Sequence, residues 1–268
     1  MERELNINVM IKMTLTSVYP TVRLWPAVIR TRIRTEYSYL NGEKNGKIKE
    51  YDKYSGALLI EGEYLNGEKN GSIKEYGENE ILLFEGNYIK GERNGKGKEY
   101  DYDELIFEGE YLNDKRWNGK GKEYERFGLI YEGEYLNGKR NGQGKEYYYD
   151  ELIFEGEYLN NKRWNGKGKE YDTDTDGLIY EGEYLNGERN GKGKEYYKDG
   201  NILYDGEYKN GKWNGMGKEY YSKKDQLKYE GKYLDGKWNG KGKEYFQNGK
   251  LKYEGEFLNG KKIKNKKK

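Results

Sequence analysis

A single stretch, YEGEYLNGKRNGQGKEY from Tyr131 to Tyr147, recurs along most of this chain. A fixed period of this size indicates a repeat array, in which each unit packs against its neighbours, rather than a domain with one irregular core. The worn first copy, at Thr35, lacks the Glu-Gly pair. The other copies begin, at steps of 23 to 26 residues, at Ile60, Phe84, Phe107, Phe154, Tyr180, Tyr204, Tyr229 and Tyr253.

The composition leaves few aliphatic side chains for a closed core. Charged residues make up 37% of the chain and hydrophobic residues 33%, and 31 residues are tyrosines. High charge with low aliphatic content is typical of disorder. The aromatic residues, however, recur in register from unit to unit, which disorder does not require. We therefore expect an ordered array whose core is mainly aromatic.

Side chains within a unit alternate with a period of two, which is typical of a β-strand. Tyr131, Gly133 and Tyr135 fall on one face of such a strand, and the glutamates between them fall on the other. Glycine weakens a strand interior unless another group approaches closely. We therefore expect Gly133 to leave a slot for an aromatic ring from the neighbouring strand.

Each strand is followed by a turn and a second alternating segment. Residues 137–142, Asn-Gly-Lys-Arg-Asn-Gly, are rich in residues that accept positive φ and favour a hairpin connection. The segment 142–148 then alternates again, so each unit is predicted to be a β-hairpin. The turn register leaves open whether Tyr147 shares the face of Tyr131. About ten tandem hairpins predict an all-β fold, an elongated single-layer antiparallel β-meander.

The charge distribution divides the chain into three parts. Residues 1–34 carry a net charge of +4 and contain no glycine, and we interpret them as a lead-in or cap that covers the first repeat. Residues 261–268 form a basic tail with a net charge of +6. Since the whole chain is +2, the array over residues 35–260 is −8. This acidic body makes nucleic acid an unlikely partner.

The units resemble a known repeat family. Tyr-Glu-Gly-Glu-Tyr followed by Asn-Gly-Lys-Arg-Asn-Gly-Gln-Gly, over residues 131–144, is similar to the MORN repeat, and the similarity extends over residues 35–260. The resemblance implies an elongated single-layer antiparallel sheet used for scaffolding, for self-association and, in some members, for contact with phospholipids. The sequence departs from the family where Lys145 and Glu146 occupy positions that are often more apolar, which argues against membrane contact.

Several function classes are excluded or disfavoured. The chain has no cysteine and no histidine, so it has no disulfide, thiolate or histidine chemistry. Glutamate pairs such as Glu132 and Glu134 recur in nearly every unit, which favours cross-strand ion pairs over catalysis. We therefore predict a protein that is not an enzyme and needs no cofactor. The absence of cysteine fits a cytoplasmic location, with a membrane-peripheral one as the alternative.

One stretch has the spacing of a calcium loop. Asp172, Asp174 and Asp176 stand at the first, third and fifth positions of such a loop, and Gly177 stands at the sixth. An EF-hand requires helices on both sides, whereas strands are predicted here. These three carboxylates are the metal candidate of the sequence, as an adventitious oxygen site, and we expect no resident metal.

Four tryptophans precede an Asn-Gly pair in the first turn of their units: Trp117, Trp164, Trp213 and Trp238. They are predicted to line one edge of the sheet. As a functional feature, such a row suggests anchors for a protein partner. The alternative, which we favour, is that each ring folds back over a neighbouring aromatic residue and closes the end of the sheet.

The function that these observations favour is a non-enzymatic repeat scaffold for protein–protein interaction or self-association. A single sheet has two faces to bury, so we expect an apolar stripe on at least one face that needs a partner, whose identity the sequence leaves open and which includes a second copy. The alternative is peripheral binding to acidic phospholipid membranes through an aromatic sheet face and the basic tail, with Lys266, Lys267 and Lys268 as candidate lipid contacts.

Overall fold

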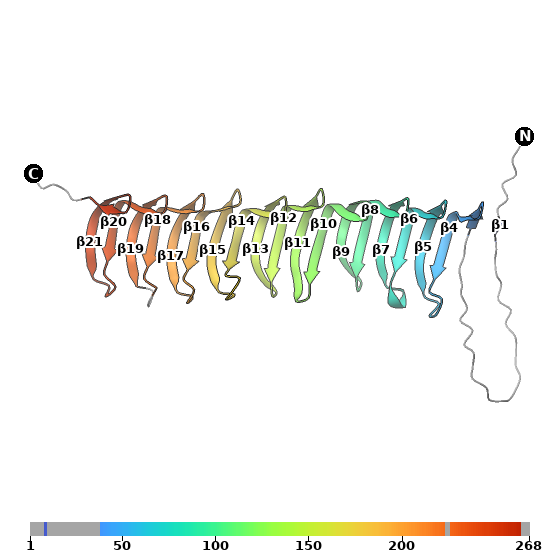
Figure 1. Ribbon diagram of the computed structural model, residues 1–268, viewed down its shortest axis with the longest axis horizontal. Helices are drawn as coiled ribbons and strands as arrows, with labels where there is room; N and C mark the ends of the chain where they lie inside the picture. The colour runs from blue at the N-terminus through green and yellow to red at the C-terminus, as the bar shows by residue number, and fades with distance from the viewer. Residues whose placement is uncertain (1–7, 10–37, 223–225, 264–268) are drawn as a thin grey trace, which may run out of the picture. The chain divides into compact units, whose positions relative to one another are not determined.

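The computed structural model describes residues 8–9, 38–222 and 226–263 (Figure 1). Most of the predicted lead-in 1–34, and Lys266, Lys267 and Lys268 of the basic tail, lie outside the described residues. The chain divides into two compact units. The first unit comprises residues up to 121 together with 135–138, and the second comprises residues 122–134 and those from 139 onward.

The first unit is a ladder of antiparallel strands in chain order. A small sheet joins β1 to β2 and β2 to β3, and β4 to β10 then pair consecutively. A short 3-10 helix, η1 (Glu78–Glu80), lies before β7. The strands are β1 (Asn8–Val9), β2 (Ser38–Leu40), β3 (Glu43–Lys44), β4 (Gly46–Tyr51), β5 (Leu58–Leu65), β6 (Glu68–Tyr76), β7 (Leu82–Ile89), β8 (Glu92–Asp101), β9 (Glu104–Leu112) and β10 (Lys115–Glu125).

The second unit repeats this arrangement. Strands β12 to β22 pair consecutively and antiparallel, and Figure 1 shows β12 to β21 side by side in chain order. The strands are β11 (Gly128–Leu136), β12 (Lys139–Tyr148), β13 (Glu151–Leu159), β14 (Lys162–Tyr171), β15 (Leu178–Leu185), β16 (Glu188–Tyr196), β17 (Ile202–Lys209), β18 (Lys212–Tyr220), β19 (Leu227–Leu234), β20 (Lys237–Tyr245), β21 (Leu251–Leu258) and β22 (Lys261–Lys262). The predicted all-β class and single-layer antiparallel meander of hairpins are confirmed.

The first turn is shorter than the connection predicted over residues 137–142, because only the first two of those residues form it and β12 already begins at Lys139. Asn137 and Gly138 both adopt positive φ, at 54° and 71°, and Asn186 and Gly187 do so at 55° and 79°. Asparagine and glycine tolerate this left-handed conformation, and its twist matches that of the flanking strands. The Asn-Gly pairs therefore set a short, nearly constant connection on one edge of the sheet.

The aromatic core lies on one side of the sheet, which we call the ring face. It carries the two aromatic residues of the first strand of each hairpin, which we call the out strand; Tyr180 and Tyr184 of β15 are an example. The buried tyrosine and phenylalanine rings of this face are 0% to 9% exposed. In the second unit Tyr180 meets Tyr184 edge-on at 5.7 Å and Tyr208 of the next hairpin at 5.3 Å. Such edge-on pairs contribute about 0.5–1.5 kcal/mol each. Rings therefore join one hairpin to the next.

The glycine slot is present, but it is filled from a different strand than expected. A Cβ atom on Gly133 would lie 2.4 Å from the hydroxyl of Tyr131, which precedes it on the same strand. A Cβ on Gly144, on the return strand, would lie 2.6 Å from the same hydroxyl. The Tyr131 hydroxyl donates to the carbonyl of Glu134 at 3.2 Å, so the ring lies along its own strand and covers both glycines. The prediction of a ring from the neighbouring strand was wrong.

The opposite side, which we call the charged face, carries the lysines and glutamates between the aromatic positions. Tyr147 belongs to this face, since its hydroxyl donates to Glu132 at 2.7 Å. Tyr196 donates to Glu181 at 2.6 Å in the same way. The array therefore has one ring face, and the last tyrosine of each unit lies behind it.

Candidate functional site

Long polar side chains cover the rings on the ring face. In each case a carboxylate on one return strand binds the second residue after the first turn of the next hairpin. Arg189 lies 4.2 Å above the centre of the Tyr180 ring and binds Glu170 at 2.6 Å. Tyr184 donates its hydroxyl to the same carboxylate at 2.6 Å. The apolar stripe predicted on at least one face is therefore absent from the ring face in the described part of the chain. On the opposite side, exposed leucines end successive out strands, as at Leu136, Leu159 and Leu185.

Trp213 and Trp238 take the place of that arginine in later hairpins. Trp213 stacks on Tyr204 with ring centres 4.3 Å apart, and Trp238 stacks on Tyr229 at 4.4 Å. The indole N–H of Trp213 donates to Glu195 at 2.9 Å, and that of Trp238 donates to Glu219 at 2.9 Å. These two rings fold back over neighbouring aromatic residues and do not project as anchors.

Trp117 and Trp164 lie in a different environment. Their hairpins have the same two-residue turn but one more residue early in the return strand. Arg116 and Arg163 occupy the position above the ring, and each tryptophan becomes the extra residue of a β-bulge. The carbonyl of Trp164 accepts the N–H of Gly187 in the next turn at 2.8 Å. All four tryptophans are half-buried. They form two pairs with different surroundings and no single row of equivalent anchors.

The candidate metal ligands Asp172 and Asp176 are engaged in hydrogen bonds, the first within its own turn and the second with a neighbouring turn. The Asp172 carboxylate accepts the N–H groups of Asp174 and Thr175 at 3.0 Å, and hydrogen bonds, led by that from the Thr175 hydroxyl, lower the pKa of Asp172. Asp176 accepts the hydroxyl of Tyr148 at 2.9 Å. Among the described residues, no group of three or more acidic side chains is arranged to hold a metal ion.

The start of the basic tail belongs to the sheet. Lys261 and Lys262 form β22, which pairs with the end of β21. The ammonium group of Lys262 binds Glu244 at 2.6 Å and lies 5.0 Å from the centre of the Tyr253 ring. Lys262 thus takes the covering position that Trp238 takes one hairpin earlier.

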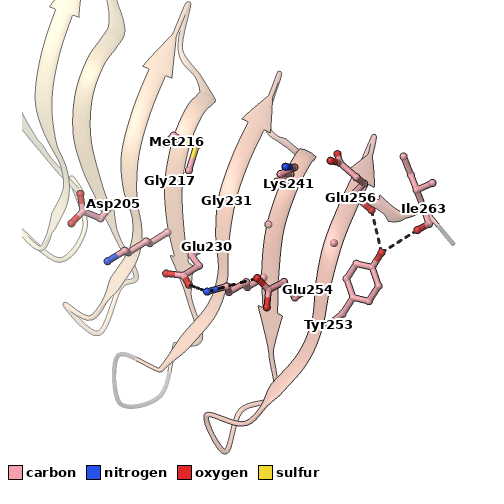
Figure 2. Close-up of a pocket in the computed structure, with 14 residues that line it drawn as sticks. Asp205, Met216, Gly217, Glu230, Gly231, Lys241, Tyr253, Glu254, Glu256 and Ile263 are labelled. Atoms are coloured by element: carbon pink, nitrogen blue, oxygen red, sulfur yellow. Dashed lines mark hydrogen bonds and ion pairs between the residues drawn. The ribbon is translucent and has the colours of Figure 1, made fainter. Parts of the chain in front are cut away.

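The charged face is hollowed over the last hairpins of the second unit (Figure 2). This groove, which we call the terminal groove, has a volume of about 1070 Å³. In Figure 2 Glu230 and Glu254 stand on neighbouring out strands, and Lys243 lies within 3.7 Å of the first and 4.0 Å of the second. The lining residues are Asp205, Met216, Gly217, Lys218, Glu230, Gly231, Lys241, Gly242, Lys243, Tyr253, Glu254, Gly255, Glu256 and Ile263.

Met216 is the residue of this groove that the sequence analysis missed. It stands between Gly215 and Gly217, where the other repeats have lysine, glutamine or serine, and its side chain is 58% exposed. A flexible, polarizable thioether suits a surface that adapts to a partner. The departure from the repeat pattern was the available signal. A smaller groove of about 520 Å³, lined by Lys167, Lys169, Glu181 and Lys194 among others, lies over β13 to β17.

The buried tyrosines predict how stability depends on alkaline pH. Burial raises the pKa of Tyr229 from its ordinary value of 10.0 to about 12. Since the folded pKa is raised, this group's contribution to stability is complete below pH 10 and is lost as pH rises toward 12. We expect exposed tyrosines to ionise at about pH 10 without unfolding, and a second rise in tyrosinate absorbance toward pH 12 to coincide with unfolding. Full titration of all tyrosines near pH 10 with the circular dichroism unchanged would contradict this.

Consecutive antiparallel hairpins, whose aromatic rings on one face pack over glycines, define a β-hairpin repeat protein. The chain belongs to the MORN-repeat family, a type of repeat scaffold. The family model described as MORN repeat matches residues 84–104, 131–152, 180–202, 204–226, 229–250 and 253–262.

Other comparisons add little to this assignment. No curated protein matches the chain significantly. A similar solved structure, titled "Crystal Structure of TcdB2-TccC3-Cdc42", is 15% identical and has a TM-score of 0.22. That match covers 78% of this chain and 14% of the other chain, so this chain spans a small part of that protein. Within the described residues, no helix is long and apolar enough to span a membrane.

Proposed function

We propose that this chain is a non-catalytic repeat scaffold that binds protein through the terminal groove, with a second copy of itself as the first partner to test. The observation that carries the proposal is the exposed Met216 on a floor of glycines. An apolar side chain surrounded by lysines and glutamates resembles the centre of an interface with a polar rim. The neighbouring Lys243, Glu230 and Glu254 supply that rim.

The outer edge of the sheet supports the same surface. In the part of the chain that the structure describes, β22 pairs with β21 through Phe257 and Leu258, and the N–H of Ile263 bonds to the carbonyl of Glu256. These contacts place Glu256 and Ile263 in the lining of the terminal groove.

Exchange of Met216 for lysine is expected to weaken self-association about tenfold with the fold intact. Lysine already stands at this position in most repeats, and removing an exposed apolar contact of this size costs about 1.4 kcal/mol at an interface. Light scattering across a concentration series measures the change. Lys192→Gln, at the same position in another hairpin, is the control. A wild-type chain that stays monomeric at the highest concentration reached would contradict self-association.

The membrane alternative depends on surfaces that differ from this groove. Arginines, tryptophans and glutamates cover the rings of the ring face, and the array itself is acidic, so both features disfavour anionic vesicles. Flotation with acidic phospholipid vesicles separates the two proposals. Binding that disappears when residues 264–268 are removed would favour the alternative, and wild-type binding at background level supports the protein scaffold.

A further inference from the structure

A cluster of exposed aromatic rings lies on the edge of the second unit opposite the Asn-Gly turns. It comprises Phe127 between β10 and β11, Tyr148 and Tyr149 between β12 and β13, and Tyr171 at the end of β14. Ring centres are 5.4 Å apart for Phe127 and Tyr149, 4.6 Å for Tyr148 and Tyr149, and 6.0 Å for Tyr148 and Tyr171. We call these four residues the turn cluster.

The turn cluster faces solvent, unlike the rings of the ring face. Phe127 is 62% exposed, Tyr149 is 61% exposed and Tyr148 is 38% exposed. Three turns that are separated in sequence supply the rings, and a Cβ atom on Gly128 would lie 2.9 Å from the carboxylate of Asp150, so the first two turns are in contact. A contiguous exposed aromatic surface of this kind marks a binding site more often than single exposed rings do.

The backbone at Tyr149 is not the one its side chain prefers. Tyr149 and Asp150 adopt positive φ, at 47° and 62°. Two-residue turns of this geometry favour Asn-Gly, and the first turns of this chain use that pair. Tyr102 and Asp103 of the first unit form the same kind of turn, so the feature that distinguishes Tyr149 is the ring contacts with Phe127 and Tyr148.

The surroundings of the turn cluster are acidic. The turn segments 125–128, 148–151 and 172–177 contain six carboxylates and one arginine, a net charge of −5. Glu151 and Asp172 already pair with Lys169 and Lys198, so the segments and these two lysines together carry −3. Arg126 lies 5.5 Å from the centre of the Phe127 ring, so one cation already sits on the cluster. Exposed aromatic faces beside carboxylates bind ammonium and guanidinium groups, since both the ring and the charge attract a cation.

We propose that the turn cluster docks the lysine-rich segment 264–268 of a second copy of this chain. That segment carries four lysines, which complement the acidic turns. It cannot reach the cluster of its own chain. Five residues extend at most about 17 Å, whereas the strands from β13 to β22 place Ile263 on the order of 40 Å from Tyr149. The contact is therefore between molecules, and it is independent of the terminal groove.

A fluorescent peptide of residues 259–268 is the probe, titrated with the full chain at low and high salt. We expect Tyr149→Asn to weaken peptide binding about tenfold, because it removes the central ring. Asparagine suits the left-handed turn, so this variant should melt no lower than the wild type. Asp150→Asn keeps the turn and removes one charge, and it should weaken binding about threefold and lower its salt dependence.

Two control variants test whether the peptide binds at the turn cluster. Tyr102→Asn changes an exposed tyrosine in the same kind of turn in the first unit, where φ is 42°, and should leave peptide binding unchanged. Met216→Lys should also leave it unchanged, so failure here and failure of the terminal groove are distinguishable. Equal affinity of Tyr149→Asn and wild type, or equal binding of a peptide with glutamine in place of every lysine, would overturn the proposal.

Discussion

Replacing Gly182 with valine is expected to destabilise the hairpin formed by β15 and β16 by about 3 kcal/mol, the largest loss that we predict for one added side chain. A Cβ atom at this position would lie 2.3 Å from the hydroxyl of Tyr180 and 2.7 Å from the Cα of Gly193. Tyr180 is 0% exposed and packs edge-on against rings of two hairpins, so it cannot move aside without disturbing both. Hydrogen exchange of the segment 178–196, with urea unfolding of the whole chain, measures the effect.

A nearby glycine provides the control for this substitution. Gly177 has no positive φ, and a Cβ there would meet the exposed hydroxyl of Thr175 at 3.3 Å. Gly177→Ala should therefore change stability by less than about 0.5 kcal/mol. Adding Tyr180→Phe to the Gly182→Val variant removes the closest clashing atom and should restore part of the loss. Native-like exchange protection in Gly182→Val alone would mean that the ring does not fill the glycine slot.

Replacing Glu219 with alanine is the second large effect that we expect, a loss of about 2–3 kcal/mol. Glu219 is 8% exposed and accepts the indole N–H of Trp238 at 2.9 Å and the hydroxyl of Tyr233 at 3.3 Å. It also binds the ammonium group of Lys228 at 2.5 Å. Without the carboxylate, the half-buried indole and the buried phenol lose their acceptor, and an unsatisfied buried donor is costly.

The control for the loss of the Glu219 carboxylate is the same substitution at a glutamate on the charged face. The side chain of Glu254 is 61% exposed and lies 4.0 Å from Lys243, so Glu254→Ala should cost less than about 1 kcal/mol. Glu219→Gln retains an acceptor and should fall between the two. Thermal unfolding followed by circular dichroism measures the loss of stability. Equal melting temperatures for the Glu219→Ala and Glu254→Ala variants would contradict the covering role of Glu219.

The repeat in the sequence was sufficient to predict the hairpin, its fixed first turn and the need for glycine at Gly133. Those features depend on local chemistry, namely alternation and tolerance of positive φ. The source of the ring in the slot depends instead on the direction of the Tyr131 side chain, which alternation alone leaves undetermined. The expectation of an apolar stripe rests on the apolar positions of a single sheet. Long residues such as Arg189 and Glu170 cover the rings, and their reach is invisible in a pattern of apolar positions.

The sequence also could not predict the strand register of the two hairpins that contain Trp117 and Trp164. The extra residue before Gly166 was evident, but its effect required the pairing: Gly156 faces Gly166, whereas in the next hairpin Gly182 faces Gly193, the second glycine of its Gly-x-Gly. Near the turn the pairing is the same, since Arg163 lies opposite Tyr158 as Arg189 lies opposite Tyr184, and Trp164 is the extra residue that follows. Tryptophans that occupy similar places in the sequence therefore have different neighbours, and a row of equivalent anchors does not form.

The covering residues have a consequence for how this chain is made. Several carboxylates of the ring face meet an arginine or a tryptophan 17 to 19 residues further along the chain, as Glu146 meets Arg163 and Glu219 meets Trp238. Some also bind an earlier residue, as Glu195 binds Arg189. During synthesis, a newly emerged hairpin therefore holds a carboxylate whose later partner has not yet been translated. The next repeat completes these contacts of the repeat before it, so we expect the repeats to become ordered one after another from the amino terminus, each one repeat behind synthesis. Lys262 of the two-residue strand β22 gives Glu244 the same kind of later partner.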